Sequence, residues 1–336
     1  MTAVSILDLA PIGRGETAAE SIATSVRVAQ RAEELGYRAV WYAEHHNFPG
    51  IASSAPSVLI AHIGAKTSSI RLGAGGVMLP NHAPLTIAEQ FGTLDAMYPG
   101  RIDLGLGRAP GTDQAAMAAL RRDPSAADTF ARDVVELQAY LAGESRVPGV
   151  QAVPGGDSHV PLYILGSSLF GAQLAAALGL PYAFASHFAP TALHQALAAY
   201  RSEFQPSKQS DRPYVMVGVN VLAADTTSAA EAQRQSVRRA RAVRLFGRQL
   251  GIAPGQEVSD EEADRVLAAG AGAHVDQMLT YTAAGAPAEI RSYVLDFLAE
   301  TGADELVTVH QAPTTEDRLR SITLFAEVMA DSTTAT

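Results

Sequence analysis

The chain has 336 residues, of which 47% are hydrophobic and only 18% are charged, so it can bury a large core. Its formal net charge of −10 argues against the basic surface that binds nucleic acids or anionic membranes. It contains no cysteine, which excludes disulfides, thiolate nucleophiles and cysteine-ligated zinc. The N-terminus lacks the pattern of a secretory signal, and no apolar run approaches the roughly 18 residues that cross a bilayer. We therefore expect a soluble, cytoplasmic protein with no membrane or nucleic-acid partner.

Strand-like and helix-like segments alternate along almost the whole chain. Strands are predicted at residues 5–10, 38–45, 70–79, 101–108, 161–166, 182–187, 214–222 and 305–310. Helices are predicted at about 22–35, 56–66, 85–97, 130–141, 169–178, 191–204, 288–300 and 317–329. Eight strands alternating with helices favour an α/β fold of the (β/α)8 TIM-barrel type over a doubly wound open sheet. No glycine-rich dinucleotide fingerprint follows the first strand, which supports this choice.

More than sixty residues separate the seventh predicted strand from the helix at 288–300. They contain a helix-like run at 229–250 and a short helix at about 260–269. An insertion after a strand's carboxyl end lies over the active face of a barrel, so we expect residues 225–286 to form a lid. The domain is predicted to run from residue 1 to 331, with 332–336 as a frayed tail.

Polar residues should gather where the strands of a barrel end, because active sites occupy that face. Five of the nine histidines lie at or just beyond a predicted strand end, namely His45, His46, His82, His187 and His310. We expect His82, His187 and His310 to contribute to a substrate pocket. The alternative explanation is that any chain becomes polar where a strand passes into a loop. Histidines are more concentrated here than that explanation requires.

The second strand changes abruptly from apolar residues to Glu44, His45 and His46. An imidazole is suited to moving protons near neutral pH, and a neighbouring carboxylate can orient it. We therefore predict His45 and Glu44 as the catalytic pair, with His46 in a supporting or structural role. A purely structural role for the whole motif is one alternative. A metal site is the weaker one, because adjacent histidines rarely bind one ion and no zinc motif accompanies them.

The third strand contains Gly73, Gly75 and Gly76, although glycine weakens a strand interior. Such a run indicates either a flat ring lying against the strand or tight packing of a helix against the strand. In Gly166-Ser167-Ser168, before a helix, a hydroxyl can cap the helix while free backbone N–H groups bind an anion. Arg108, at the end of the fourth strand, could add charge for a phosphate, or these residues could be an ordinary cap and loop.

One predicted helix of the insertion is rich in arginine, in an otherwise acidic chain. The arginines are Arg234, Arg238, Arg239, Arg241, Arg244 and Arg248. A solvated face with salt bridges is one interpretation, and a lid that attracts an anionic cofactor is the other. Nucleic acid is not favoured, because no aromatic side chains are interleaved.

At this point the sequence resembles the bacterial luciferase-like flavin monooxygenase family along nearly its whole length. The segments that carry the resemblance are 43–46, 73–80, 88–91 with 94–95, 100–108 and 179–181. It implies a TIM barrel, usually dimeric, in which reduced FMN from a separate NAD(P)H-dependent reductase and molecular oxygen oxidise a small organic substrate. Carried over by position, His45 matches the catalytic histidine with Glu44 beside it. Gly75-Gly76 matches a non-proline cis peptide behind the flavin.

The resemblance also implies that Arg108, Ser168 and Gly171 hold the flavin phosphate, with Ser167 beside them. Luciferase proper has a cysteine at the position of Gly107, a glutamate at Ser167 and a threonine at Gly171, so light emission is not implied. Two alternatives stay open. One is a deazaflavin-dependent dehydrogenase or reductase of the same superfamily, and the other is a flavin-binding protein without turnover. The substrate cannot be read from the sequence, because variable loops build its pocket.

Overall fold

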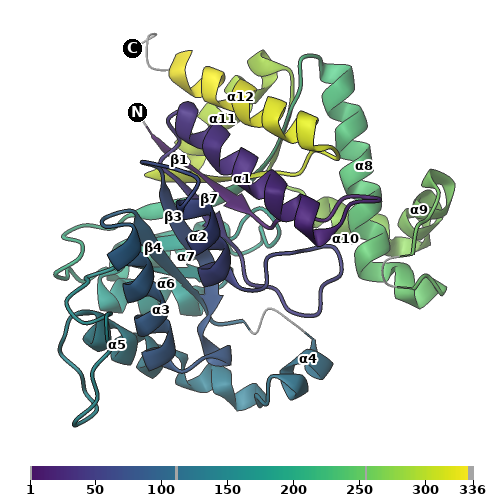
Figure 1. Ribbon diagram of the computed structural model, residues 1–336. Coiled ribbons are helices and arrows are strands. Elements are labelled where there is room, and N and C mark those ends of the chain that lie inside the picture. The colour runs from purple at the N-terminus through teal and green to yellow at the C-terminus, as the bar shows by residue number, and fades with distance from the viewer. Residues whose placement is uncertain (1, 110–112, 254–255, 332–336) are drawn as a thin grey trace.

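The computed structural model describes residues 2–109, 113–253 and 256–331, and the predicted frayed tail at 332–336 lies outside them. Eight parallel strands form a closed barrel, in which β6 pairs with β7, β7 with β9, and β9 with β1 (Figure 1). The strands are β1 (Ala3–Asp8), β2 (Ala39–Tyr42), β3 (Arg71–Met78), β4 (Ile102–Gly107), β5 (Leu162–Gly166), β6 (Tyr182–Phe184), β7 (Val215–Ala223) and β9 (Glu305–His310). The predicted (β/α)8 barrel is confirmed.

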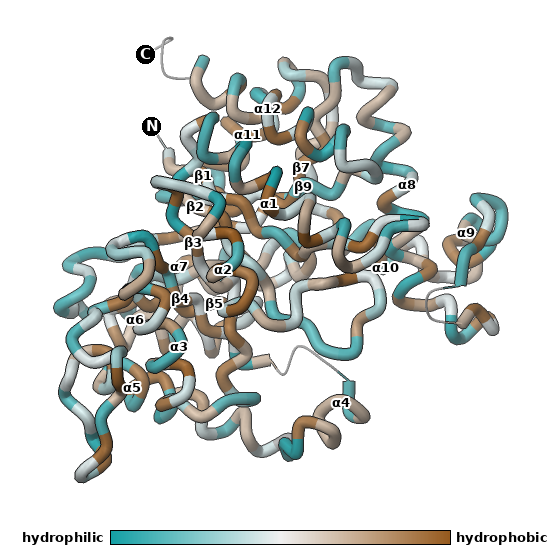
Figure 2. The backbone as a smooth tube through the Cα atoms, viewed as in Figure 1, coloured by the Kyte–Doolittle hydropathy of each residue, from teal (hydrophilic) through white to brown (hydrophobic). Residues whose placement is uncertain are grey.

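Helices surround this barrel, and each follows a strand along the chain. They are α1 (Ala18–Glu34), α2 (Pro56–Gly64), α3 (Pro84–Met97), α5 (Phe130–Leu141), α6 (Leu169–Leu178), α7 (Leu193–Glu203), α11 (Pro287–Thr301) and α12 (Thr315–Asp331). Their ends follow local chemistry: Thr17 and Glu20 form a capping box at the start of α1, and Gly179 ends α6 in the left-handed conformation. In Figure 2 the central strands are mainly hydrophobic, whereas outer turns of helices such as α9 are hydrophilic.

Side chains alternate between the two faces of each barrel strand. On β2, Trp41 packs inside the barrel with Leu7 and Met216, whereas Tyr42 packs outside against the surrounding helices. The larger core therefore lies between strands and helices, and the smaller one fills the barrel interior.

A buried polar network closes the amino-terminal end of the barrel. Arg38 lies 3.6 Å from Asp103 and 3.4 Å from Glu305, and it donates to the Tyr163 hydroxyl at 2.8 Å. The indole of Trp41 donates to Asp103 at 3.1 Å. Since this end is filled, the barrel opens at the carboxyl ends of its strands.

One strand was not predicted. The short strand β8 (Thr282–Gly285) pairs with the last four residues of β7, beyond the closed barrel. The predicted eighth barrel strand at 305–310 is β9. After Thr282, β8 consists of alanine and glycine, which have low strand propensity, so its pairing comes from tertiary contact with the long β7.

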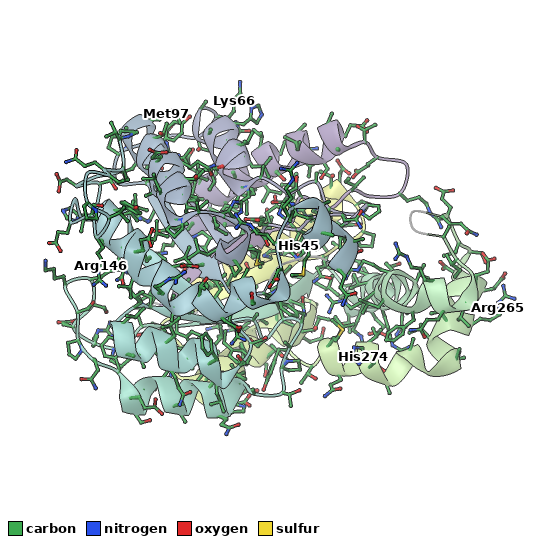
Figure 3. The ribbon with its side chains drawn as sticks, turned by 90° about the horizontal axis from the view of Figure 1, so that it is seen from below. His45, Lys66, Met97, Arg146, Arg265 and His274 are labelled. Carbon is green, nitrogen blue, oxygen red and sulfur yellow. The ribbon has the colours of Figure 1, made fainter. Side chains whose placement is uncertain are left out.

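The insertion between β7 and β8 is mostly helical. It contains α8 (Thr227–Phe246), η3 (Gly247–Leu250), α9 (Asp260–Val266), η4 (Leu267–Ala271) and α10 (Gly272–Met278). The long and the short predicted helices are present, and α10 extends the helical structure beyond the prediction. Figure 3 shows Arg265 and His274 in this part of the chain, which projects to one side of the barrel.

Two short helical segments after β4 were also missed, α4 (Gln114–Ala119) and η2 (Pro124–Thr129). In the part of the chain that the structure describes, no helix combines the length and apolar character needed to cross a membrane.

Candidate active site

A cavity of about 910 Å³ opens at the carboxyl ends of the barrel strands. Asp8, Ala43, Gly107 and His310 line it from the ends of four strands or the residues that follow them, and Ser167 lies just after a fifth. Its volume is in the range of sites that bind cofactors or drug-sized ligands. The expectation that the chemistry gathers at this face therefore agrees with the position of the cavity.

His45 faces this cavity from the loop after β2. Its backbone N–H donates to the Ser53 carbonyl at 3.0 Å, and the Ser53 hydroxyl donates to the Ala43 carbonyl. These bonds fix the turn that carries the imidazole. The His45 ring lines the cavity and packs edge-on against Phe48.

The His45 imidazole is held in its neutral form. Burial lowers its pKa below the ordinary value, and the nearby positive charge of Arg244 lowers it further, whereas Glu44 opposes the shift. Nδ1 is buried and has no hydrogen-bond partner among the described residues. A neutral imidazole on the wall of a cavity can accept a proton from a bound molecule.

Glu44 points away from the cavity, because neighbouring side chains of an extended segment face opposite sides. Its Oε1 accepts from Nε2 of His46 at 2.9 Å and from Nε2 of His82 at 2.8 Å, and Oε2 accepts from the Met78 N–H at 3.1 Å. Burial alone would raise the pKa of Glu44, but the bonds from His82, His46 and Met78 outweigh it and lower that pKa. Glu44 is therefore a buried carboxylate that ties the end of β2 to the end of β3.

Glu44 therefore acts on His45 through its charge and through the backbone that the two neighbours share. The direct partners of the carboxylate are His46 and His82. His82, expected in the substrate pocket, is absent from the described lining of the cavity because its imidazole turns toward Glu44.

Gly75 and Gly76 are joined by a cis peptide bond and line the cavity. A Cβ at Gly75 would lie 2.7 Å from a methyl carbon of Leu7, and one at Gly76 would lie 2.8 Å from the Gly105 carbonyl oxygen. Packing within the barrel therefore requires both glycines, but the contacts come from neighbouring strands and not from a helix packed on the strand, as the second interpretation above had it. The peptide still leaves a cavity wall without side chains, against which a flat ring could lie.

Arg108, Ser167 and Ser168 meet on one side of the cavity, at the start of α6. The Arg108 guanidinium stacks 4.2 Å above the Phe170 ring. Ser168 is the N-cap of α6, but its hydroxyl makes no capping bond, which differs from the expected cap. Gly171 lines the same region. An arginine, two exposed hydroxyls and the N-terminus of a ten-residue helix suit a phosphate.

His187 and His310 both reach the cavity and are almost fully buried. Burial, with the charge of Arg241, lowers the pKa of His187 to about 3. Burial, with the charge of Arg318, lowers the pKa of His310 to about 3. Both are neutral rings, and His310 Nδ1 bonds to the Ser321 hydroxyl at 2.8 Å.

Several cavity residues did not stand out as site candidates in the sequence. Arg318 of α12 forms an ion pair with Asp8 at the end of β1, with 2.9 Å between Nη2 and Oδ1, and both side chains are buried. Arg241 of α8 donates from Nη2 to Gln311 Oε1 at 3.1 Å. An aspartate ending the first strand was a usable signal, whereas nothing in the spacing distinguished Arg241 from the other arginines of its helix.

A metal centre finds no support in the described ranges, where no group of three or more histidine, aspartate or glutamate side chains is placed to hold an ion.

Comparison with known proteins gives matches along most of the chain. The family model described as luciferase-like monooxygenase matches residues 2–305. A protein of Escherichia coli strain K12 named luciferase-like monooxygenase is 48% identical over 327 residues, which is 97% of this chain and 96% of that protein. The N-acetyl-S-alkylcysteine monooxygenase of Bacillus subtilis strain 168 is 35% identical over 274 residues, 80% of each chain.

Among solved structures, apo-MsnO8 superimposes with a TM-score of 0.84 and 35% identity, covering 98% of this chain and 99% of its own. Structures below 25% identity share the fold alone. They include the oxygenating constituent of 3,6-diketocamphane monooxygenase in complex with FMN, with a TM-score of 0.70, and an F420-dependent secondary alcohol dehydrogenase, with a TM-score of 0.69.

Proposed function

This chain belongs to the luciferase-like monooxygenase family, and we propose that it is the FMN-dependent oxygenase component of a two-component monooxygenase. The observation that carries the proposal is the placement of His45, with its lowered pKa, on the wall of a cavity that also contains a corner suited to a phosphate. By likeness to the family, a separate NAD(P)H-dependent flavin reductase would supply reduced FMN, and the chain would form a homodimer.

The cavity lining suits a flavin mononucleotide. Arg108, Ser167 and Ser168 would bind the phosphate, with Gly171 leaving the first turn of α6 close to the strand behind it. The Gly75-Gly76 peptide would form the flat wall behind the ring. When bound, reduced FMN supplies the activation of molecular oxygen.

His45 is proposed to move protons at the reacting end of the cavity. Because its pKa is lowered by burial and by Arg244, the ring is available as a proton acceptor at neutral pH. Glu44 is proposed as a positioning residue, since it acts on the strand ends around His45. His187 and His310 are proposed to shape the substrate side of the cavity as neutral groups.

The insertion at 225–286 is proposed to be a lid of the single domain 1–331. Val237, Arg241 and Arg244 of α8 and Met278 of α10 line the cavity, so the insertion already forms part of its wall. The insertion also reaches the loop before α1, where Arg14 donates to the Val258 carbonyl at 2.5 Å. A closed lid would exclude water from the reacting atoms.

One alternative has specific support, and a second is less favoured. A hydride-transferring enzyme that uses a deazaflavin is favoured by the shared fold with F420-dependent enzymes. A flavin-binding protein without turnover would need the same phosphate corner, but the presence of His45 in the cavity argues for turnover.

Anaerobic titration with reduced FMN and with a reduced deazaflavin tests these options. We expect saturable binding of reduced FMN, followed by substrate-dependent oxygen uptake in a screen of thioethers, aldehydes, ketones and alkanes. The named relative that acts on N-acetyl-S-alkylcysteine makes thioethers a reasonable first group. Tighter binding of the deazaflavin without oxygen uptake would replace the proposal by the dehydrogenase alternative.

A further inference from the structure

Two arginines of α8 differ from the others on that helix. Arg234 pairs with Glu231 at 2.7 Å, Arg238 with Asp276 at 2.6 Å, and Arg239 with Asp260 at 2.6 Å. The structure records no carboxylate partner for Arg241 or Arg244 within residues 2–109, 113–253 and 256–331. In an acidic chain, this leaves two positive charges on the cavity side of one helix.

Arg241 is the more unusual of the two. Only 5% of it is exposed, and its Nε and Nη1 are buried without a hydrogen-bond partner in the described chain. Its one recorded bond is from Nη2 to Gln311 Oε1 at 3.1 Å, and Gln311 is itself held by a 2.7 Å bond to Asn220. A buried, unpaired guanidinium is costly, so its position is best explained by an anion that completes it.

Arg244 stands one turn further along the same face of α8 and also lines the cavity. Its guanidinium lies 5.4 Å from the centre of the Phe48 ring, beside His45. Burial, together with the charges of Arg244 and Arg241, lowers the pKa of His45 and of His187, so the positive charge at this corner comes from the arginines.

The corner lies across the cavity from the proposed phosphate site. Arg108 follows β4, whereas Arg241 bonds to Gln311, which follows β9, and these two strands are opposite one another in the closed order of eight. A phosphate at Arg108 therefore leaves the arginine corner free. Leu7, Phe48 and Val309 supply apolar surface in the same cavity.

We propose that Arg241, assisted by Arg244, binds a carboxylate of the substrate, which makes the substrate class an organic monoanion with an apolar body. This inference rests on the proposed function, in which the cofactor phosphate occupies the site at Arg108 and Arg241 is left to the substrate. The planar guanidinium suits a carboxylate, and the bond forms in a water-poor corner where it is strongest.

The test uses a matched pair of probes, 4-phenylbutanoate and its neutral amide, titrated calorimetrically into the full chain saturated with oxidised FMN. We expect the carboxylate to bind at least about tenfold more tightly, as for a hydrogen bond to a charged group.

Arg241→Met should abolish that preference, and Arg241→Lys should keep part of it. Arg234→Met on the same helix is the matched control and should leave it unchanged. Arg244→Met should reduce the preference, and it provides a second variant should Arg241→Met fold poorly.

Three outcomes would overturn the proposal. The wild-type chain could bind the two probes equally, or the preference could persist in both Arg241→Met and Arg244→Met. A loss of FMN affinity in Arg241→Met, with circular dichroism unchanged, would assign the arginine to the cofactor instead. Failure of the wild-type chain to bind FMN at all would contradict the proposed function, which is a separate result from equal binding of the probes.

Discussion

Glu44 and His45 are neighbours in the chain, yet their side chains serve opposite sides of the barrel wall. The His45 ring lines the cavity, whereas the Glu44 carboxylate accepts bonds from His46 and His82 behind it. The two interact electrostatically: the charge of Glu44 raises the pKa of His45 and so opposes the effects of burial and Arg244. His45 is therefore the residue that can contact a ligand, and Glu44 is the residue that positions His45.

Glu44→Gln should therefore lower the pKa of His45 further, because the one opposing negative charge named above is removed. It should also destabilise the fold by about 1–3 kcal/mol, since His46 and His82 lose a charged acceptor. Titration of the His45 ring signals by NMR measures the first effect, and urea unfolding the second. Glu261→Gln on the exposed face of α9 is the control. An unchanged His45 titration would remove Glu44 from the positioning role.

His45→Ala should leave FMN binding nearly intact and should uncouple oxygen consumption from product formation. The reason is that the variant keeps the phosphate corner and the Gly75-Gly76 wall but loses the proton acceptor. Oxygen uptake measured together with product gives the coupling ratio. His62→Ala on the exposed face of α2 is the control, and coupled turnover equal to wild type would contradict the role of His45.

Arg108→Ala should weaken FMN binding about tenfold or more, as expected for the loss of a charge-assisted bond to phosphate. Riboflavin, which has no phosphate, should bind the variant and the wild-type chain equally. Fluorescence titration with both ligands measures this difference. Arg132→Ala on the exposed side of α5 serves as the control. A variant that binds FMN as the wild type does would place the phosphate elsewhere.

The buried histidines predict how stability depends on pH. The pKa of His187 and of His310 is about 3 in the fold, whereas an unfolded histidine titrates near about 6.5. The unfolded chain therefore binds more protons between these values, so the free energy of unfolding decreases as the pH falls below about 6.5. The decrease should reach about 1.4 kcal/mol per pH unit for each histidine.

Urea unfolding of wild type and His310→Gln at about pH 5 and above pH 7 measures this slope. Replacing His310 should make the pH dependence less steep, whereas His62→Gln, on an exposed histidine, should not. Parallel curves for wild type and His310→Gln would show that His310 is not neutral in the fold.

The barrel and much of the candidate site could be predicted from the sequence, because each depends on local signals. Strand–helix alternation predicted eight barrel strands, and the change from Trp41 to Glu44 and His45 marked a strand end. The direction of each side chain could not be predicted in the same way. His82 turns to Glu44, and Arg241 faces the cavity while Arg239 faces Asp260, because tertiary packing decides these orientations.

The strand β8 was missed for the same reason. Three of its four residues are alanine or glycine, which have little strand propensity, and the strand pairs with the part of β7 that extends past the barrel. The Gly75-Gly76 run was noticed, but its packing against Leu7 and Gly105 involves strands that are distant in the sequence.

The central claim is that the chain inserts oxygen into a substrate with reduced FMN, and isotope labelling tests it most directly. The chain would be saturated with reduced FMN and with a substrate identified by the oxygen-uptake screen, and then exposed to ¹⁸O₂. Mass spectrometry would measure the mass of the product. The account predicts one labelled oxygen atom per product molecule, with less labelled product from His45→Ala. For a product whose oxygen does not exchange with water, such as a sulfoxide, an oxidised product that carries no label would contradict the account.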